Sequence, residues 1–304
     1  MDMHVSSIPP SEGLRSVREP AYELLLPATP SGPLVLTSPH SGRDYPDRLL
    51  AATRLDPMTL RRSEDSFVEL ILSGAPRLGC PLLHALFPRV WCDVNREAWE
   101  LDQAMFQDRL PDWVNARSPR VAAGLGTIAR VVATGEPIYC RRLSFAEAEA
   151  RIASCWKPFH QALAGLVEEA RAACGFAVLL DCHSMPSVQG ADFKGAAMPD
   201  FVLGDAHGTA CHPWLTERAE RLLSAMGYSV RRNDPYAGGY ITRHYGAPRQ
   251  GVHALQLEMN RALYMDEQRF QPLGTLARLS ADIERLIADL VGTDWRAAGL
   301  AYRR

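Results

Sequence analysis

Short apolar runs alternate with longer amphipathic runs along the chain, and this alternation restricts the possible folds more than any other feature. Seven apolar runs predict buried strands, at residues 33–37, 81–87, 89–94, 176–180, 201–203, 228–231 and 254–257. Strands that alternate with helices are typical of parallel sheets covered on both faces. We therefore expect an α/β fold, in a single three-layer domain with a mostly parallel mixed sheet flanked by helices.

Three stretches repeat apolar residues at the spacing of an α-helix, at residues 144–174, 213–226 and 276–290. The first begins with a capping box, in which Ser144 accepts the amide of Glu147 and Glu147 reaches back. Pro158 lies inside this stretch and should kink or split the helix. A glycine stops each stretch: Gly175, Gly227 and Gly292.

The composition is that of an ordinary globular protein, with 304 residues, 47% of them hydrophobic, and a formal net charge of −2. This charge argues against a nucleic-acid-binding protein, which usually carries a basic excess. The seven cysteines include no C-x-x-C pair, so a reducing cytoplasm fits better than a disulfide framework. No apolar run reaches the roughly 18 residues of a membrane span, and the first residues lack a signal-peptide pattern. We expect residues 1–20 to form a loosely held arm and residues 21–304 to form one domain.

Polar side chains follow several of the predicted strands at their carboxyl ends: His40, residues 93–96, His183, residues 205–207 and residues 258–261. In open α/β sheets, ligands bind beyond the carboxyl ends of the strands. The sequence therefore predicts a functional site at this edge of the sheet.

Two of these side chains are the histidines His40 and His183, each at the end of a buried strand. Neutral imidazole is a common ligand of transition metals, and a catalytic Zn²⁺ takes two or three histidines with a carboxylate. Asp181 shares a strand face with His183 and could orient its ring. Spacing alone does not choose between Glu64 and Asp65 as the acidic ligand. The alternative for either acid is that it stabilises the start of a helix through the helix dipole. The alternative for His183 is a buried histidine bonded to a carbonyl.

Glu258 is acidic where its strand should still be buried, and burial raises the pKa of a carboxyl group that lacks a partner. A raised pKa suits a general base that takes a proton from an attacking water. A structural ion pair with Arg261 is the alternative.

Asn95 and Arg96 together offer the donors that bind a carboxylate in two places, unless Arg96 forms only a surface salt bridge. The paired glycines within residues 236–243 predict a mobile loop. From this loop Tyr240 and Arg243 could close over a substrate, and a plain surface loop is the alternative.

Six segments carry a family pattern: SPHSGRDYP at 38–46, EDSFVE at 64–69, DVNR at 93–96, DCHSMP at 181–186, LGDAHGTAC at 203–211, and YAGGYITRHYGAP with GVHALQLEMNRALYMDE at 236–267. In this order they resemble the N-formylglutamate amidohydrolase family. The resemblance extends over about residues 34 to 267 and implies a fold similar to zinc carboxypeptidases and N-acyl amino acid deacylases. It also implies one catalytic domain over residues 21–304.

This resemblance implies that one Zn²⁺ per chain is bound by His40, Asp65 and His183, and that Glu258 is the general base. The carboxypeptidases have an acidic ligand three residues after the first histidine, where this chain has Arg43. A ligand must therefore come from elsewhere, which favours Asp65.

The resemblance further implies that Asn95 and Arg96 bind a substrate carboxylate, with Tyr240 and Arg243 as additional substrate-binding residues. The implied reaction is cytoplasmic hydrolysis of N-formyl-L-glutamate to formate and glutamate. We expect a small-molecule substrate, no nucleic-acid or membrane partner, and a monomer or small homo-oligomer.

The residues leave three alternatives open. The first is a zinc deacylase or exopeptidase that cleaves another acyl group. The second is a non-haem iron enzyme, which uses the same set of two histidines and one carboxylate. The third is a carboxylate-binding protein without catalysis. Metal analysis and turnover of different N-acyl amino acids distinguish these alternatives.

Overall fold

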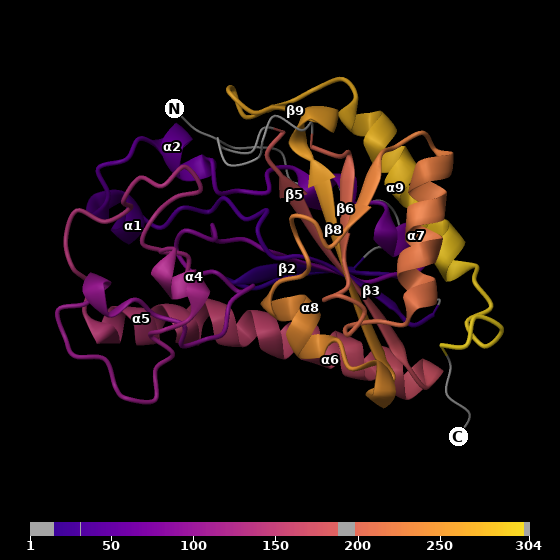
Figure 1. Cartoon of the computed structure of the whole chain (residues 1–304), viewed down its shortest axis with the longest axis horizontal. Coiled ribbons are helices and arrows are strands. Elements are labelled where there is room, and N and C mark those ends of the chain that lie inside the picture. Colours follow the sequence, from indigo (N-terminus) through magenta and orange to yellow (C-terminus); the bar gives the residue numbers. More distant parts are fainter. Residues whose placement is uncertain (1–14, 31, 188–197, 301–304) are drawn as a thin grey trace.

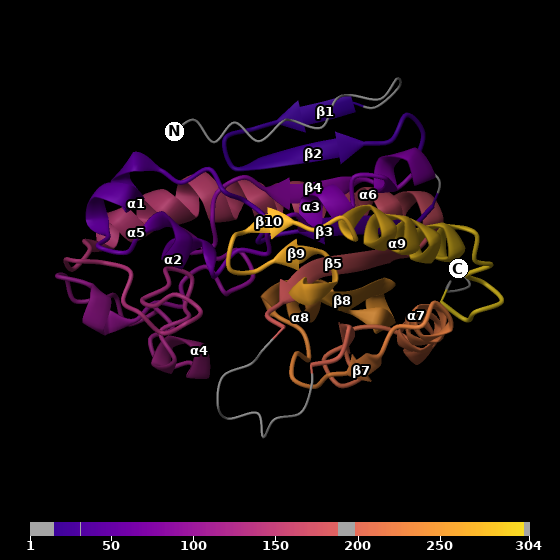
Figure 2. The same ribbon diagram turned by 90° about the horizontal axis from the view of Figure 1, so that it is seen from above.

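The computed structural model describes residues 15–30, 32–187 and 198–300. Within them, eight strands form one sheet with the order β1-β2-β4-β3-β5-β8-β6-β7. Figure 2 shows β1 and β2 at one edge of this sheet and β7 at the other. The strand bounds are β1 Arg15–Arg18, β2 Tyr22–Leu26, β3 Leu34–Ser38, β4 Leu82–Ala85, β5 Ala177–Met185, β6 Phe201–Gly204, β7 Val230–Arg232 and β8 Val252–Asn260.

The four central strands β4, β3, β5 and β8 run parallel to one another. Antiparallel pairs join β2 to β4 and β6 to β8. A separate short hairpin consists of β9 Met265–Asp266 and β10 Gln271–Pro272. The predicted mostly parallel mixed sheet is therefore confirmed, and β3 to β8 correspond to six of the predicted strands.

Helices cover both faces of the sheet, with α5 and α6 in line along one face and α7 and α9 on the other (Figure 1). The helix bounds are α1 Asp47–Ala52, α2 Pro57–Arg61, α3 Val68–Ile71, α4 Pro119–Ala122, α5 Phe145–Arg151, α6 Lys157–Cys174, α7 Pro213–Ala225, α8 Tyr240–Tyr245 and α9 Leu276–Val291. No helix in the described part of the chain is both long and apolar enough to cross a bilayer.

The predicted helix at residues 144–174 is present but divided. Its capping box is formed by Ser144 and Glu147 as expected. A π-helical segment at Ile152–Trp156 separates α5 from α6, and Pro158 lies in the first turn of α6. A proline in a first turn leaves no hydrogen bond unmade, so the split accommodates the residue that was predicted to break the helix.

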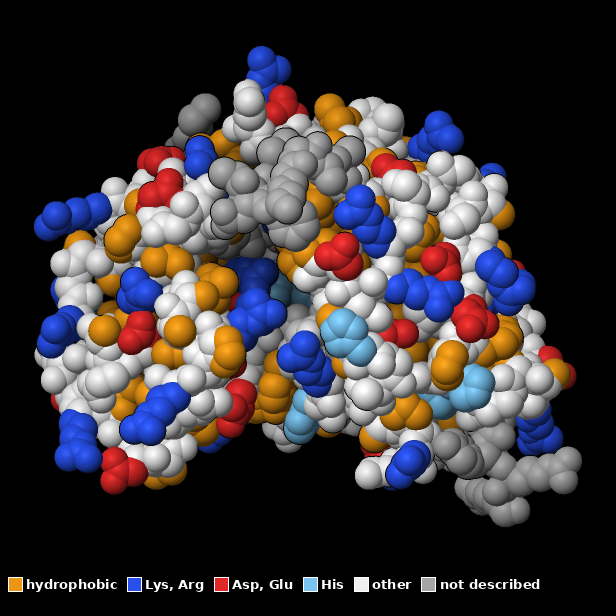
Figure 3. All heavy atoms as spheres, in the orientation of Figure 1, with side chains coloured by type: hydrophobic (Ala, Val, Ile, Leu, Met, Phe, Trp, Pro, Cys, Tyr) orange, Lys and Arg blue, Asp and Glu red, His pale blue; other side chains and the backbone are white. Residues whose placement is uncertain are grey.

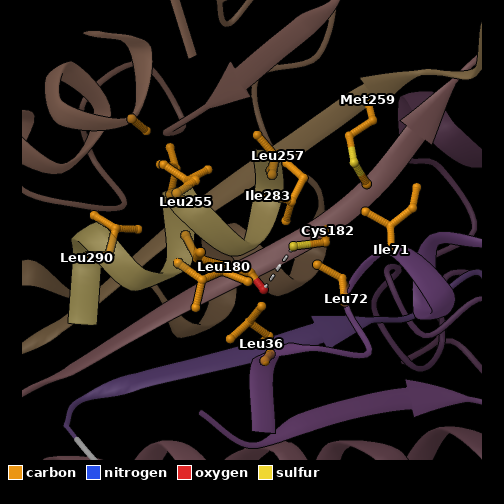
Figure 4. Close-up of a cluster of buried hydrophobic side chains, with 14 of the residues drawn as sticks. Leu36, Ile71, Leu72, Leu180, Cys182, Leu255, Leu257, Met259, Ile283 and Leu290 are labelled. Carbon is orange, nitrogen blue, oxygen red and sulfur yellow. Dashed lines mark hydrogen bonds between the residues drawn. The ribbon is translucent and has the colours of Figure 1, made fainter. Parts of the chain in front are cut away.

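Alternation of side chains along the strands gives each face its own core. On one face Leu180 and Leu255 pack with Ile283 of α9, as Figure 4 shows. On the other face Leu179 of β5 packs with Phe159 of α6. Toward the carboxyl ends of β5 and β8 this second face changes from apolar to polar. The change creates a polar site at the end of a hydrophobic core.

Three predicted segments differ in the structure. Residues 15–18 form β1, which pairs with β2, so the predicted loose arm does not extend through residue 20; residues 1–14 lie outside the described residues. Residues 89–94 form turns instead of a strand. The segment 236–243 is not a loop throughout, because α8 begins at Tyr240.

Candidate metal centre and active site

Three segments that are distant in the sequence place His40, Asp65 and His183 together. His40 lies two residues beyond β3, Asp65 precedes α3, and His183 lies near the carboxyl end of β5. Potential ligand atoms of these three side chains lie within 4.8 Å of one another, and all three residues are buried. The Nδ1 atoms of His183 and His40 lie 3.1 Å and 3.4 Å from Asp65 Oδ2. The structure therefore assembles the group that was predicted to hold a metal.

The opposite nitrogen of each ring faces a carboxylate. His40 Nε2 lies 2.7 Å from Asp93 Oδ1, and His183 Nε2 lies 2.9 Å from Asp181 Oδ1. This arrangement suits neutral imidazoles that donate from Nε2 and present a lone pair at Nδ1. His40 Nδ1 is buried without a hydrogen-bond partner. The donor set of two imidazoles and one carboxylate oxygen thus fits a metal ion such as Zn²⁺.

The structure also separates the two candidate acids. Glu64 is buried and accepts hydrogen bonds from Tyr45, Arg61 and Ser66, with Tyr45 Oη and Ser66 Oγ at 2.7 Å and 2.6 Å. These contacts engage both of its carboxylate oxygens. Asp65, in contrast, faces the two histidines.

Electrostatics make this site attractive to a cation. Burial alone would raise the pKa of Asp65, but hydrogen bonds and charges from His183 and His40 hold it well below its usual value. The pKa of Asp93 is also well below its usual value, because the charges of Arg89 and His40 outweigh burial. Burial would lower the pKa of His183, yet Asp181 and Asp65 raise it well above its ordinary value. Positive charge between the rings and Asp65 is therefore favoured, whether a proton or a metal ion supplies it.

Glu258 lies beside the histidines on the neighbouring strand. In the parallel pairing of β5 with β8 it is the partner of His183, and Gln256 is the partner of Asp181. Burial raises the pKa of Glu258 to about 7, against the opposing charge of His183. Gln256 Nε2 donates to Glu258 Oε1 at 2.8 Å. Arg261 contacts Asp65 instead of Glu258, so the structure does not show the structural pair that was the alternative for Glu258.

Asn95 lies between His183 and the first turn of α8. Its Nδ2 lies 3.2 Å from His183 Nε2, and its Oδ1 accepts from the Ile241 amide at 2.8 Å. Tyr240 donates its backbone amide to the Asn95 carbonyl, and its ring stacks on His244 at 4.8 Å. Asn95 therefore lies against His183, and Tyr240 contacts Asn95 from the first turn of α8.

The predicted arginines occupy different environments. Arg96 is buried, and its Nε and Nη1 donate to the carbonyls of Leu125 and Asn95 at 2.8 Å and 2.7 Å. Burial lowers the pKa of Arg96 to about 10. Arg243 is an exposed residue of α8.

The roles of two site residues were not recognised from the sequence. Asp93 lies in the predicted polar segment 93–96 and pairs with Arg96, whose Nη2 lies 3.8 Å from Asp93 Oδ2, but its contact with the ring of His40 was not predicted. Arg89, whose Nη2 lies 2.7 Å from Asp93 Oδ2, has a quarter of its side chain exposed (25%). Both lie in the stretch that was predicted as a strand. Asp181, two residues before His183, was predicted correctly as a ring partner.

The polar segment 205–207 does not join the site. β6 runs antiparallel to β8, with Gly204 opposite Gln256, so the chain leaves β6 in the direction away from Glu258 and from the carboxyl ends of β3, β5 and β8. Asp205 bonds instead to Gly208, Thr216 and Asn233.

Figure 3 shows a hollow near the centre of one face, with Lys and Arg side chains at its rim and a histidine in its depth.

Gly239 packs closely against Asn95, and a substitution at Gly239 tests the importance of this contact. A Cβ atom at Gly239 would lie 2.3 Å from Asn95 Nδ2. We expect Gly239→Ala to lower the free energy of unfolding by about 1–3 kcal/mol and to lower kcat/KM, since Asn95 must move away from His183. Urea unfolding and steady-state kinetics measure both effects.

Gly165 provides the matched control. It lies in α6 with nothing within 4 Å of an added Cβ. Gly165→Ala should leave kcat/KM unchanged and raise the free energy of unfolding by about 0.5–1 kcal/mol, because alanine favours the helix. Equal behaviour of the two variants would contradict the role given to Gly239.

Comparison with known proteins identifies the family. The sequence model described as N-formylglutamate amidohydrolase matches residues 32–265. The N-formylglutamate deformylase of Pseudomonas aeruginosa is 32% identical over 262 residues, which cover 85% of this chain and 91% of that protein. The N-formylglutamate deformylase of Pseudomonas putida is 31% identical over 238 residues, covering 77% of this chain and 82% of that protein.

Solved structures agree with this result. The crystal structure of N-formylglutamate amidohydrolase from Ralstonia eutropha JMP134 matches with a TM-score of 0.85 and 35% identity, covering 92% of this chain and 100% of that chain. A protein from Agrobacterium tumefaciens shares the fold, with a TM-score of 0.62 and 19% identity over 89% of this chain and 94% of that chain. From the family match and the relatives above 30% identity, the chain belongs to the N-formylglutamate amidohydrolase family and is a hydrolase that acts on an amide bond.

Proposed function

We propose that this chain hydrolyses N-formyl-L-glutamate to formate and glutamate, using one Zn²⁺ held by His40, Asp65 and His183. The supporting observation is that both Nε2 atoms face carboxylates while the two Nδ1 atoms face the same oxygen of Asp65. A bound Zn²⁺ would supply a Lewis acid for the amide carbonyl and would lower the pKa of the attacking water. The relatives named N-formylglutamate deformylase support the choice of substrate.

Glu258 is the proposed general base, and its neighbours determine which of its oxygens acts. The Gly239 amide donates to Gln256 Oε1 at 2.7 Å, so the NH₂ group of Gln256 faces Glu258. Because that NH₂ group occupies Oε1, Glu258 Oε2 is the oxygen available to the attacking water. In this proposal Oε2 takes the proton of the water and then passes it to the leaving amine.

Glutamate carries two carboxylates, so the substrate needs more than one cation. Arg89 is partly exposed beside the site, and Arg243 is exposed on α8. In our proposal Asn95 and Arg96 bind one substrate carboxylate, and Tyr240 covers the substrate. Arg96 uses Nε and Nη1 on two carbonyls, and Arg89 uses Nε and Nη2 on Asp93, so the exposed Arg243 is the proposed partner of the second carboxylate.

The substrate spectrum tests this proposal. Protein loaded with Zn²⁺ is expected to show its highest kcat/KM with N-formyl-L-glutamate among the formyl, acetyl and succinyl derivatives, measured by amine or formate release. N-formyl-L-glutamine lacks one charge, so we expect its kcat/KM to be about 10- to 100-fold lower, as for the loss of one charged hydrogen bond. Faster cleavage of an acetyl or succinyl derivative would favour the deacylase alternative.

A further inference from the structure

The carboxylate of Asp65 has two oxygens with different partners. Oδ2 faces the Nδ1 atoms of His183 and His40, at 3.1 Å and 3.4 Å. Oδ1 faces away from them, toward Arg261 Nη2 at 3.2 Å and Ser184 Oγ at 3.3 Å. One oxygen thus belongs to the candidate metal centre, and the other is occupied by two donors of the protein.

Arg261 is held rigidly in this position. It begins the 3₁₀ turn Arg261–Leu263 directly after β8, and it is 6% exposed. Its Nη1 donates to the Arg62 carbonyl at 3.2 Å, its Nη2 to the Glu64 carbonyl at 2.5 Å, and its Nε to Ser184 Oγ at 3.1 Å. A planar fork with these acceptors has little freedom to rotate. Arg261 therefore fixes the end of β8 to the segment that carries Asp65.

The charge of Arg261 matters because of the acids around it. Asp65, Asp93, Asp181 and Glu258 are all buried within or beside the cluster. A buried carboxylate oxygen without a partner is unfavourable, so an unpaired Oδ1 would turn toward any cation at the centre. Arg261 removes this tendency by pairing Oδ1 on the side away from the histidines.

We propose that Arg261, assisted by Ser184, is a positioning residue that restricts Asp65 to a single metal-ligating oxygen. This inference rests on the proposed metal centre. With Asp65 limited to Oδ2, the chain supplies three ligand atoms and leaves a coordination position for the attacking water or the substrate carbonyl. Without Arg261, Asp65 supplies both oxygens and occupies that position.

Cobalt binding tests the proposal independently of turnover. Co²⁺ replaces Zn²⁺ in such sites, and its visible absorption weakens as the number of ligands increases. The metal-free full-length protein is titrated with Co²⁺ as wild type, Arg261→Met, Arg261→Lys and Arg62→Met. Arg62 is the matched control, because its exposed side chain lies beside the same segment and only its carbonyl contacts Arg261.

For Arg261→Met we expect weaker Co²⁺ absorption than in wild type and a Kd about 10- to 100-fold higher, as for the loss of other partners of metal ligands. Arg261→Lys should restore part of both properties, because it keeps the charge without the fork. Arg62→Met should stay within about twofold of wild type, as for a surface charge.

Each other outcome is decisive. An unchanged spectrum and Kd in Arg261→Met overturns the proposal, and an equal loss in Arg62→Met does so too, because it would indicate a general charge effect. If Arg261→Met does not fold, Ser184→Ala decides. It removes one donor to Oδ1, so it must shift the spectrum in the same direction, and an unchanged spectrum overturns the proposal. If wild type itself binds no Co²⁺, the metal centre of the proposed function fails instead.

Discussion

Replacing His183 with alanine is expected to remove the bound Zn²⁺ and to lower formate release by at least about 10³-fold, since a metal ion contributes several kcal/mol to the transition state and 1.36 kcal/mol is a factor of ten. The side chain is buried, with Nδ1 3.1 Å from Asp65 Oδ2, so the substitution takes away one of three proposed ligands. Within the described ranges, no second group of three such side chains is present to replace it.

Metal content by mass spectrometry and kcat/KM for N-formyl-L-glutamate measure the effect. His207→Asn is the control. His207 belongs to a family segment and was predicted to lie at the site, but β6 places it elsewhere. Asparagine is chosen because His207 has a φ of 56°, which asparagine tolerates better than alanine. The control should keep its metal and its kcat/KM. Unchanged formate release in His183→Ala would refute the metal assignment, and iron instead of zinc in wild type would favour the non-haem iron alternative.

The sequence was sufficient to predict the parallel strands because strands buried on both faces are continuous apolar runs. Val178 and Leu179 illustrate this pattern, since they pack into the cores on opposite faces of β5. The same logic predicted His183, because polar residues directly after such a run indicate the carboxyl end of a strand, although β5 continues to Met185 and His183 is buried within it. Local rules were therefore enough for the sheet and for the two histidines.

The prediction of Asp65 as the acidic ligand required more than the spacing of residues. Its choice over Glu64 came from the family resemblance and from Arg43, which stands where related enzymes have an acidic ligand. In the structure Arg43 forms an ion pair with Glu69, and Glu64 is occupied by other partners. Which of two adjacent acids faces a site depends on tertiary contacts, which no local pattern contains.

The errors also have tertiary causes. Val90, Cys92 and Val94 are buried and alternate like a strand, yet no strand among the described residues pairs with them and their backbone forms turns. The Asp93 amide donates to the Thr127 carbonyl, 34 residues away in sequence, at 2.7 Å. Burial alone therefore does not distinguish a strand from a packed turn. The direction of β6 is equally invisible to periodicity, which explains the wrong placement of residues 205–207.

Glu258→Gln is expected to lower kcat by about 10²- to 10⁴-fold, the usual contribution of a general base, while leaving the bound Zn²⁺ in place. Glutamine has nearly the same shape and can still accept the hydrogen bond from Gln256 at Oε1. It cannot take a proton from the attacking water. Metal content therefore separates this variant from His183→Ala, in which activity and metal are lost together. Glu284→Gln, which breaks only a surface pair with Arg77, should leave kcat unchanged.

The pH dependence provides a second test of the same residue. Burial raises the pKa of Glu258 to about 7 without a metal, and a bound cation lowers it, so the acid decrease in kcat/KM of wild type should be centred below pH 7. Glu258→Gln should lack this decrease. In metal-free protein the pH dependence of stability runs opposite to that of activity. A carboxyl group whose pKa is raised by folding stabilises the fold at low pH and loses that contribution as the pH rises toward 7. The Tm of Glu258→Gln relative to wild type should therefore increase between pH 5 and pH 8. If the variant kept kcat within tenfold of wild type together with the same acid limb, another group would be the base, and the buried carboxyl at position 258 would be structural.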